Sequence, residues 1–111
     1  MGSFAWYQEA LAETHNMRTS WQTHALQDLE DIYQYISNDN VRAALDVSAT
    51  IMELVERQLP FFPRSGRVGR IAGTRELVIS KTQYIVVYEI VEEQINVLSI
   101  LHTSQRWPEG F

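Results

Sequence analysis

Hydrophobic residues recur every three or four positions in two consecutive segments, which is the spacing of amphipathic helices. The first segment, "THALQDLEDIYQYISNDN", begins at Thr23 and ends in the polar turn "SNDN". The second runs from about Val41 to Leu59, and Pro60 and Pro63 after it cannot continue a helix. Because a short polar turn joins the segments, we predict an antiparallel helical hairpin, with Thr23 as the N-cap of its first helix.

The period changes to two in the second half of the chain, where β-branched and aromatic residues become frequent. Three strands are predicted at "TRELVI" (residues 74–79), "YIVVYEI" (84–90) and "INVLSIL" (95–101), and a shorter one at "MRTSW" (17–21). The short polar connections predict a meander. The order β-α-α-β-β-β therefore indicates an α+β fold, a small antiparallel β-sheet with an N-terminal antiparallel helical hairpin on one face.

The first sixteen residues differ in character from the rest. A second methionine, Met17, begins a segment that has the length of one ordinary domain. We interpret residues 17–111 as that domain and residues 1–16 as an N-terminal extension, a tag or a partner-derived peptide that docks on it.

Composition narrows the class of protein. The absence of cysteine excludes disulfides and thiolate metal sites, and no apolar run has the roughly 20 residues of a membrane span. We therefore expect a cytoplasmic protein without membrane contact. The net charge of −5 argues against a protein that coats nucleic acid. Five of the nine basic residues nevertheless fall between Arg64 and Lys81, which indicates one directed anionic partner.

The positive charge is concentrated in "PRSGRVGRIAGTRE", residues 63–76, which we call the arginine loop. Its arginines alternate with small residues, as in loops that bind phosphate or carboxylate groups, while the glycines also suit tight turns. The residues we expect to contact a target or partner are Arg64, Arg67, Arg70, Arg75, Lys81 and Trp107. Trp107 is alternatively a residue that packs the tail against the sheet.

Arg75 has a structural alternative, because a strand arginine can pair internally with Asp28, Asp31 or Glu76. The acids Asp28, Glu30 and Asp31 are expected to form a solvated helix face rather than a metal site. The three histidines lack the spacing of metal ligands, and "GRVGRIAG" precedes a strand instead of a helix, unlike a dinucleotide-binding motif. We predict no metal and no cofactor.

Four blocks of the sequence resemble the RelE/ParE family of toxins from bacterial type II toxin–antitoxin modules. They are "ALQDLEDIYQYI", "PRSGRVGRIAGTRELVI", "YIVVYEI" and "INVLSILHTSQRWP", and the resemblance spans Met17 to Pro108. It implies the α+β fold described above and a cognate antitoxin whose extended tail wraps the toxin in a hetero-oligomer.

The resemblance leaves two targets, DNA gyrase for the ParE-like branch and mRNA on the ribosome for the RelE-like branch. RNA cleavage in the second branch uses lysines and arginines that stabilise charge on the scissile phosphate. The corresponding positions here hold Glu76, Val78, Ile85 and Gln105. We therefore favour a gyrase inhibitor without catalytic residues of its own.

An mRNA endoribonuclease that uses His102 and the loop arginines is the alternative, since histidine exchanges protons near neutral pH. A strand-end histidine bonded to the backbone or the tail is the simpler interpretation of His102. A third hypothesis is an inert family member that acts through a repressor complex.

Overall fold

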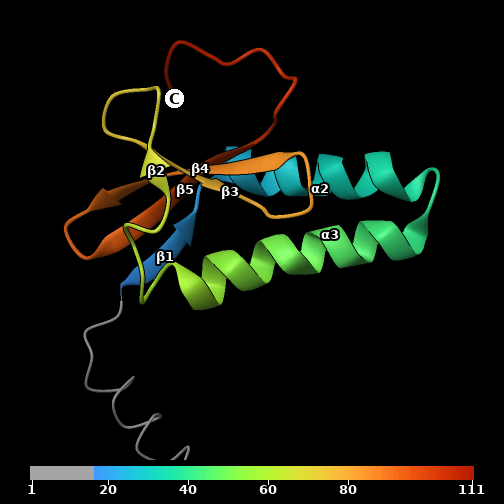
Figure 1. The fold of residues 1–111 in the computed structure, drawn as a ribbon, viewed down its shortest axis with the longest axis horizontal. Coiled ribbons are helices and arrows are strands. Elements are labelled where there is room, and N and C mark those ends of the chain that lie inside the picture. The colour runs from blue at the N-terminus through green and yellow to red at the C-terminus, as the bar shows by residue number, and fades with distance from the viewer. Residues whose placement is uncertain (1–16) are drawn as a thin grey trace, which may run out of the picture.

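The predicted helical hairpin is present and packs against a five-stranded sheet in the computed structural model, which describes residues 17–111 (Figure 1). The interpretation of residues 1–16 as an extension lies outside the described residues. The elements are β1 (Arg18–Trp21), α2 (Thr23–Ser37), α3 (Val41–Glu53), the π-helical turn η2 (Leu54–Gln58), β2 (Arg67–Val68), β3 (Arg75–Val78), β4 (Tyr84–Val91) and β5 (Gln94–His102).

The sheet has the order β1-β5-β4-β3-β2 and confirms the predicted fold class. Strands β3 to β5 form the expected antiparallel meander, and the short strand β2, which lies in the predicted loop, pairs antiparallel with β3. Strand β1 pairs in parallel with β5, from Arg18 opposite Gln94 to Trp21 opposite Val97. The sheet is therefore mixed. Alternation of side chains along a strand carries no information about direction, so the period of two could not predict this pairing.

The helix ends differ in detail from the prediction. Gln22 precedes α2 in extended conformation and makes no side-chain cap, so Thr23 is the first helical residue and its assignment as N-cap is wrong. Asn40 caps α3, because its Oδ1 accepts a hydrogen bond of 3.0 Å from the backbone nitrogen of Ala43. The predicted second helix continues beyond α3 into η2, where Leu59 donates to the carbonyl of Leu54.

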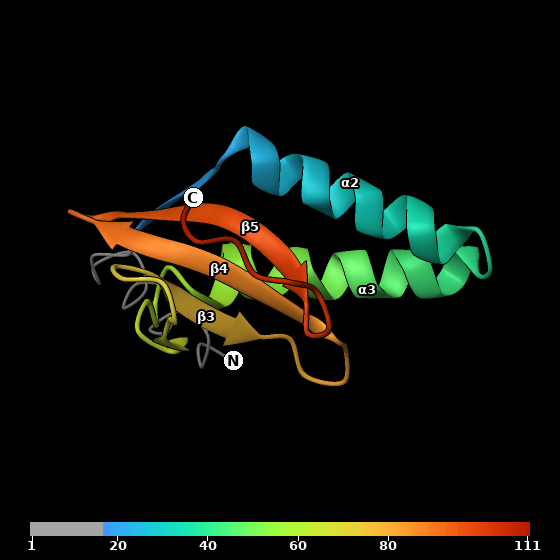
Figure 2. The same ribbon diagram turned by 90° about the horizontal axis from the view of Figure 1, so that it is seen from above.

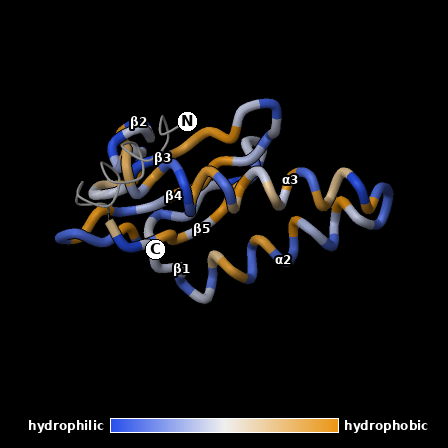
Figure 3. The backbone as a smooth tube through the Cα atoms, turned by 90° about the horizontal axis from the view of Figure 1, so that it is seen from below, coloured by the Kyte–Doolittle hydropathy of each residue, from blue (hydrophilic) through white to orange (hydrophobic). Residues whose placement is uncertain are grey.

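The main core lies between the hairpin and one face of the sheet. The tube in Figure 3 alternates between hydrophobic and hydrophilic residues along both helices, as expected for helices with one buried face. The buried residues that pack together there are Ala25, Ile32, Ile51, Val55, Leu59, Leu77, Ile79, Val86, Tyr88, Ile95, Val97 and Ile100. None of the helices in residues 17–111 combines the length and hydrophobicity that a membrane crossing needs.

The opposite face of the sheet is covered by the C-terminal tail, residues 103–111. Figure 2 shows the tail running over β4 and β5, with α3 behind the sheet. Ile85 and Leu101 are cross-strand partners on this face, as are Val87 and Ser99, and all four are buried. The tail and the arginine loop lie on the same side of the sheet, and this arrangement positions the candidate site.

Candidate functional site

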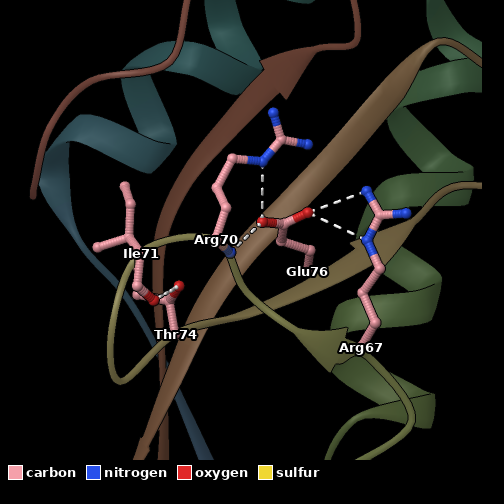
Figure 4. A network of polar contacts seen from close by, with 5 residues as sticks. All are labelled: Arg67, Arg70, Ile71, Thr74 and Glu76. Carbon is pink, nitrogen blue, oxygen red and sulfur yellow. Dashed lines mark hydrogen bonds and ion pairs between the residues drawn. The ribbon is translucent and has the colours of Figure 1, made fainter.

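Glu76 is the centre of the arginine loop. It lies on β3, its residue is 2% exposed, and its carboxylate accepts four hydrogen bonds from two arginines (Figure 4). Arg67 donates to Oε1 from Nε at 3.1 Å and from Nη2 at 2.9 Å. Arg70 donates to Oε2 from its backbone nitrogen at 2.8 Å and from Nε at 3.3 Å. Both carboxylate oxygens are therefore satisfied despite their burial.

The two arginines keep Glu76 ionised. Burial raises the pKa of this carboxyl group, but the hydrogen bonds from the Arg70 backbone and from both guanidinium groups outweigh it, so the pKa lies below 4.5. The guanidinium groups remain about half exposed, with side-chain exposures of 55% for Arg67 and 50% for Arg70. Two positive charges and one negative charge leave these three groups with one net positive charge at the surface.

Arg70 also connects the loop to the C-terminal tail. Its Cζ atom lies 3.6 Å from the centre of the Trp107 ring, in the geometry of a cation–π contact. Trp107 is half-buried, and Figure 2 shows the tail that carries it running over β4 and β5. The tail borders a groove of about 980 Å³ whose lining includes Gln22, His24, Glu89 and Leu98.

The turn that begins the loop depends on a buried tyrosine from β4. The Tyr88 hydroxyl donates to the carbonyl of Pro63 at 2.7 Å and accepts from the backbone nitrogen of Gly66 at 3.0 Å. Burial raises the pKa of this hydroxyl, so it stays protonated and can donate. A Cβ atom at position 66 would lie 2.6 Å from the hydroxyl oxygen, which explains the glycine.

Arg75 is structural, but not through the ion pairs considered for it. Its Nη1 donates to the carbonyl of Gly66 at 2.8 Å, and no ion pair joins it to an acid within residues 17–111. Glu76, one of the acids considered as a partner of Arg75, pairs with Arg67 and Arg70 instead. Arg67 is its cross-strand neighbour.

The remaining predicted contact residues are spread apart. Arg64 is exposed and its carbonyl lies 3.5 Å from Arg75 Nη1. Lys81 is in the β3–β4 turn with a φ of 66°, at the far end of β3 from the pairing with β2. The basic cluster of the sequence therefore divides into the arginine loop and one isolated lysine.

Asp28 closes the edge of β5 instead of forming a solvated acidic face. Its Oδ2 accepts from Ser99 Oγ at 2.7 Å and from the backbone nitrogen of Ile100 at 3.0 Å, beyond the point where β1 ends. His24 Nε2 lies 3.5 Å from the same oxygen. Within residues 17–111 no group of three His, Asp or Glu residues is arranged to hold a metal ion.

His102 lies on the other face of the sheet from the Glu76 network. Its ring packs edge-on against Tyr84 with centroids 5.3 Å apart, and Tyr84 belongs to the hairpin side of the sheet. The backbone nitrogen of Ser104 donates to His102 Nδ1 at 3.1 Å, as the simpler interpretation anticipated. The fold does not bring His102 and the loop arginines together.

The fold is shared with chains from two solved structures of toxin–antitoxin systems. It matches a chain of the chromosomal ParDE system from P. aeruginosa (TM-score 0.65, 22% identity, 80% of this chain and 98% of that one). It also matches a chain of the RelBE2 toxin–antitoxin complex from Mycobacterium tuberculosis (TM-score 0.57, 20% identity, 81% of this chain and 94% of that one).

The sequence comparisons identify the family. Residues 20–107 match the model of the family described as "ParE toxin of type II toxin-antitoxin system, parDE". A curated Sinorhizobium fredii protein named "Putative toxin Y4kP" is 40% identical over 92 residues, which are 83% of this chain and 94% of that protein. The chain belongs to the ParE toxin family.

Proposed function

We propose that the protein arrests bacterial growth by inhibiting DNA gyrase in the cytoplasm and is neutralised by a cognate antitoxin in a hetero-oligomer. Membership of the ParE family supports the toxin role. We assign contact with the antitoxin and the target to the arginine loop, which lies beside the tail. The loop is basic, whereas the chain as a whole has a net charge of −5.

The observation that favours gyrase inhibition over RNA cleavage is the use of the loop arginines. Both donate to the buried carboxylate of Glu76, and a carboxylate in that place would repel a scissile phosphate. His102, the candidate acid or base, is on the opposite face of the sheet. An RNA-cleaving site needs these groups around one phosphate.

The test is a pair of assays on the same purified protein. We expect DNA gyrase to accumulate cleaved plasmid DNA in its presence, while mRNA on translating ribosomes stays intact. Gyrase activity that is unaffected, together with mRNA cuts that disappear in His102→Ala, would establish the nuclease instead. Arg42→Ala is the control for His102→Ala, because Arg42 is exposed on α3 and its replacement should leave both assays unchanged.

A further inference from the structure

We propose that Arg70 is the residue that binds a carboxylate group of an acidic partner segment, and that Glu76 and Trp107 are positioning residues for it. This inference rests on the proposed function, in which the arginine loop contacts the antitoxin. It goes further by naming one residue, the group that it binds and the residues that hold it.

Three contacts hold Arg70 in place, and the terminal nitrogens of its guanidinium group remain open. Its backbone nitrogen and Nε both donate to Glu76, and its Cζ atom lies over the ring of Trp107. Within residues 17–111 its two terminal nitrogens have no hydrogen-bond partner, and Figure 4 shows them directed away from Glu76. Two parallel N–H groups at the end of a guanidinium match the two oxygens of a carboxylate.

Arg67 is the less suitable of the two arginines. It presents Nε and Nη2 together to one oxygen of Glu76, so the edge of its guanidinium group is already occupied by a carboxylate. The second N–H of Nη2 and those of Nη1 remain on its terminal edge, but within residues 17–111 no aromatic ring holds this guanidinium group as Trp107 holds that of Arg70. Arg70 is therefore the arginine whose terminal nitrogens are held in place for an external carboxylate.

The stack on Trp107 adds rigidity. Immobilising a side chain with many rotamers opposes binding, and a guanidinium group already held on a ring avoids part of that loss of conformational entropy. Trp107 Nε1 is buried without an acceptor among residues 17–111, so no hydrogen bond from the indole explains how this ring is placed. The guanidinium group of Arg70 is one contact that holds the ring in place.

The charge of the site selects a carboxylate of a protein over nucleic acid. Arg67, Arg70 and Glu76 together carry one positive charge, which a single carboxylate neutralises. The whole chain carries a net charge of −5, which disfavours the closely spaced phosphates of a nucleic acid. An acidic peptide segment with one carboxylate at Arg70 fits both facts.

The experiment measures binding of a fluorescein-labelled peptide of five glutamates by anisotropy at low salt, with a five-glutamine peptide and a labelled DNA strand alongside. Arg70→Lys keeps the charge but removes the paired donors, and we expect its Kd to rise about tenfold, which corresponds to a loss of about 1.4 kcal/mol. Arg67→Lys and the exposed control Arg57→Lys should stay within about threefold. Circular dichroism and urea unfolding check that each variant is folded.

A double-mutant cycle separates positioning from structural support. Trp107→Leu should weaken peptide binding in the wild-type background and add nothing in the Arg70→Lys background. Equal losses for Arg67→Lys and Arg70→Lys, additive losses in the cycle, or tighter binding of DNA than of the glutamate peptide would each overturn the proposal. Gyrase inhibition is measured separately, so a toxin that inhibits gyrase without binding the peptide refutes only this inference, and the reverse result refutes only the proposed function.

Discussion

Replacing Glu76 with glutamine removes the charge at the centre of the arginine loop and keeps the size of the side chain. Four N–H groups of Arg67 and Arg70 donate to the carboxylate at 2.8 to 3.3 Å. Glutamine offers one acceptor oxygen, and its amide hydrogens then face the donors of the other arginine. Because both arginines are half exposed and can turn to water, we expect the free energy of unfolding to fall by about 2 kcal/mol, less than for a fully buried pair.

Urea unfolding followed by circular dichroism at pH 7 measures this loss, and the melting temperature should fall by about 8 °C for a domain of this size. Glu53→Gln is the matched control, because Glu53 forms an exposed pair with Arg57 at 4.0 Å. Removing that pair should change the free energy of unfolding by less than about 0.5 kcal/mol. A Glu76→Gln variant as stable as the control would refute the central role of the carboxylate.

The dependence on pH gives the same reasoning a second test. The pKa of Glu76 is lower in the folded chain than the usual 4.5, because the hydrogen bonds from the two arginines outweigh the effect of burial. A lowered folded-state pKa stabilises the protein above the unfolded pKa, and this stabilisation is lost as the pH falls through the folded value. The difference between wild type and Glu76→Gln should therefore stay constant from pH 7 down to about pH 5 and shrink at lower pH. A difference that widens in acid would contradict this account.

Two further substitutions test how the arginine loop is built. Tyr88→Phe leaves the buried N–H of Gly66 without its acceptor and should lower the free energy of unfolding by about 2 kcal/mol in urea, whereas Tyr35→Phe, on a side chain exposed to 75%, should have no effect. Gly69→Ala would place a Cβ atom against Thr74 Oγ1 and 2.8 Å from the Thr74 carbonyl oxygen, so a loss of about 1–3 kcal/mol is expected in the same assay. Unchanged urea midpoints for both variants would show that the loop tolerates rearrangement.

Periodicity predicted the elements well because burial imposes it directly on the sequence. The strand predicted at residues 84–90 is β4, one residue longer, and the strand predicted at 95–101 is β5, extended by one residue at each end. The parallel pairing of β1 was missed because it joins Arg18 to Gln94, and direction depends on how the intervening chain folds. Local patterns do not carry such distant information.

The sequence predicted which residues belong to the candidate site, but not which hydrogen bonds and ion pairs connect them. The sequence drew attention to Arg67 and Arg70, but it presented Glu76 as an obstacle to phosphate binding or as a possible partner of Arg75, not as the partner of Arg67 and Arg70. A single acid among five basic residues was the available signal that it organises them. The roles of Tyr88 and Asp28 could not be predicted, because their partners lie at least 22 and 71 residues away along the chain.

If Arg70 binds an acidic partner as proposed, the arrangement explains how a protein with a net negative charge can do so. With a net charge of −5, the chain repels anions at long range, but charges beyond about 8 Å are screened at physiological ionic strength. Within that distance the local balance decides, and Arg67, Arg70 and Glu76 leave one positive charge. Because Glu76 and Trp107 both hold Arg70, the proposed site presents this charge through the terminal nitrogens of Arg70. Recognition then depends on the direction in which one guanidinium group is held, and a partner that cannot place a carboxylate there gains nothing from the basic residues around it.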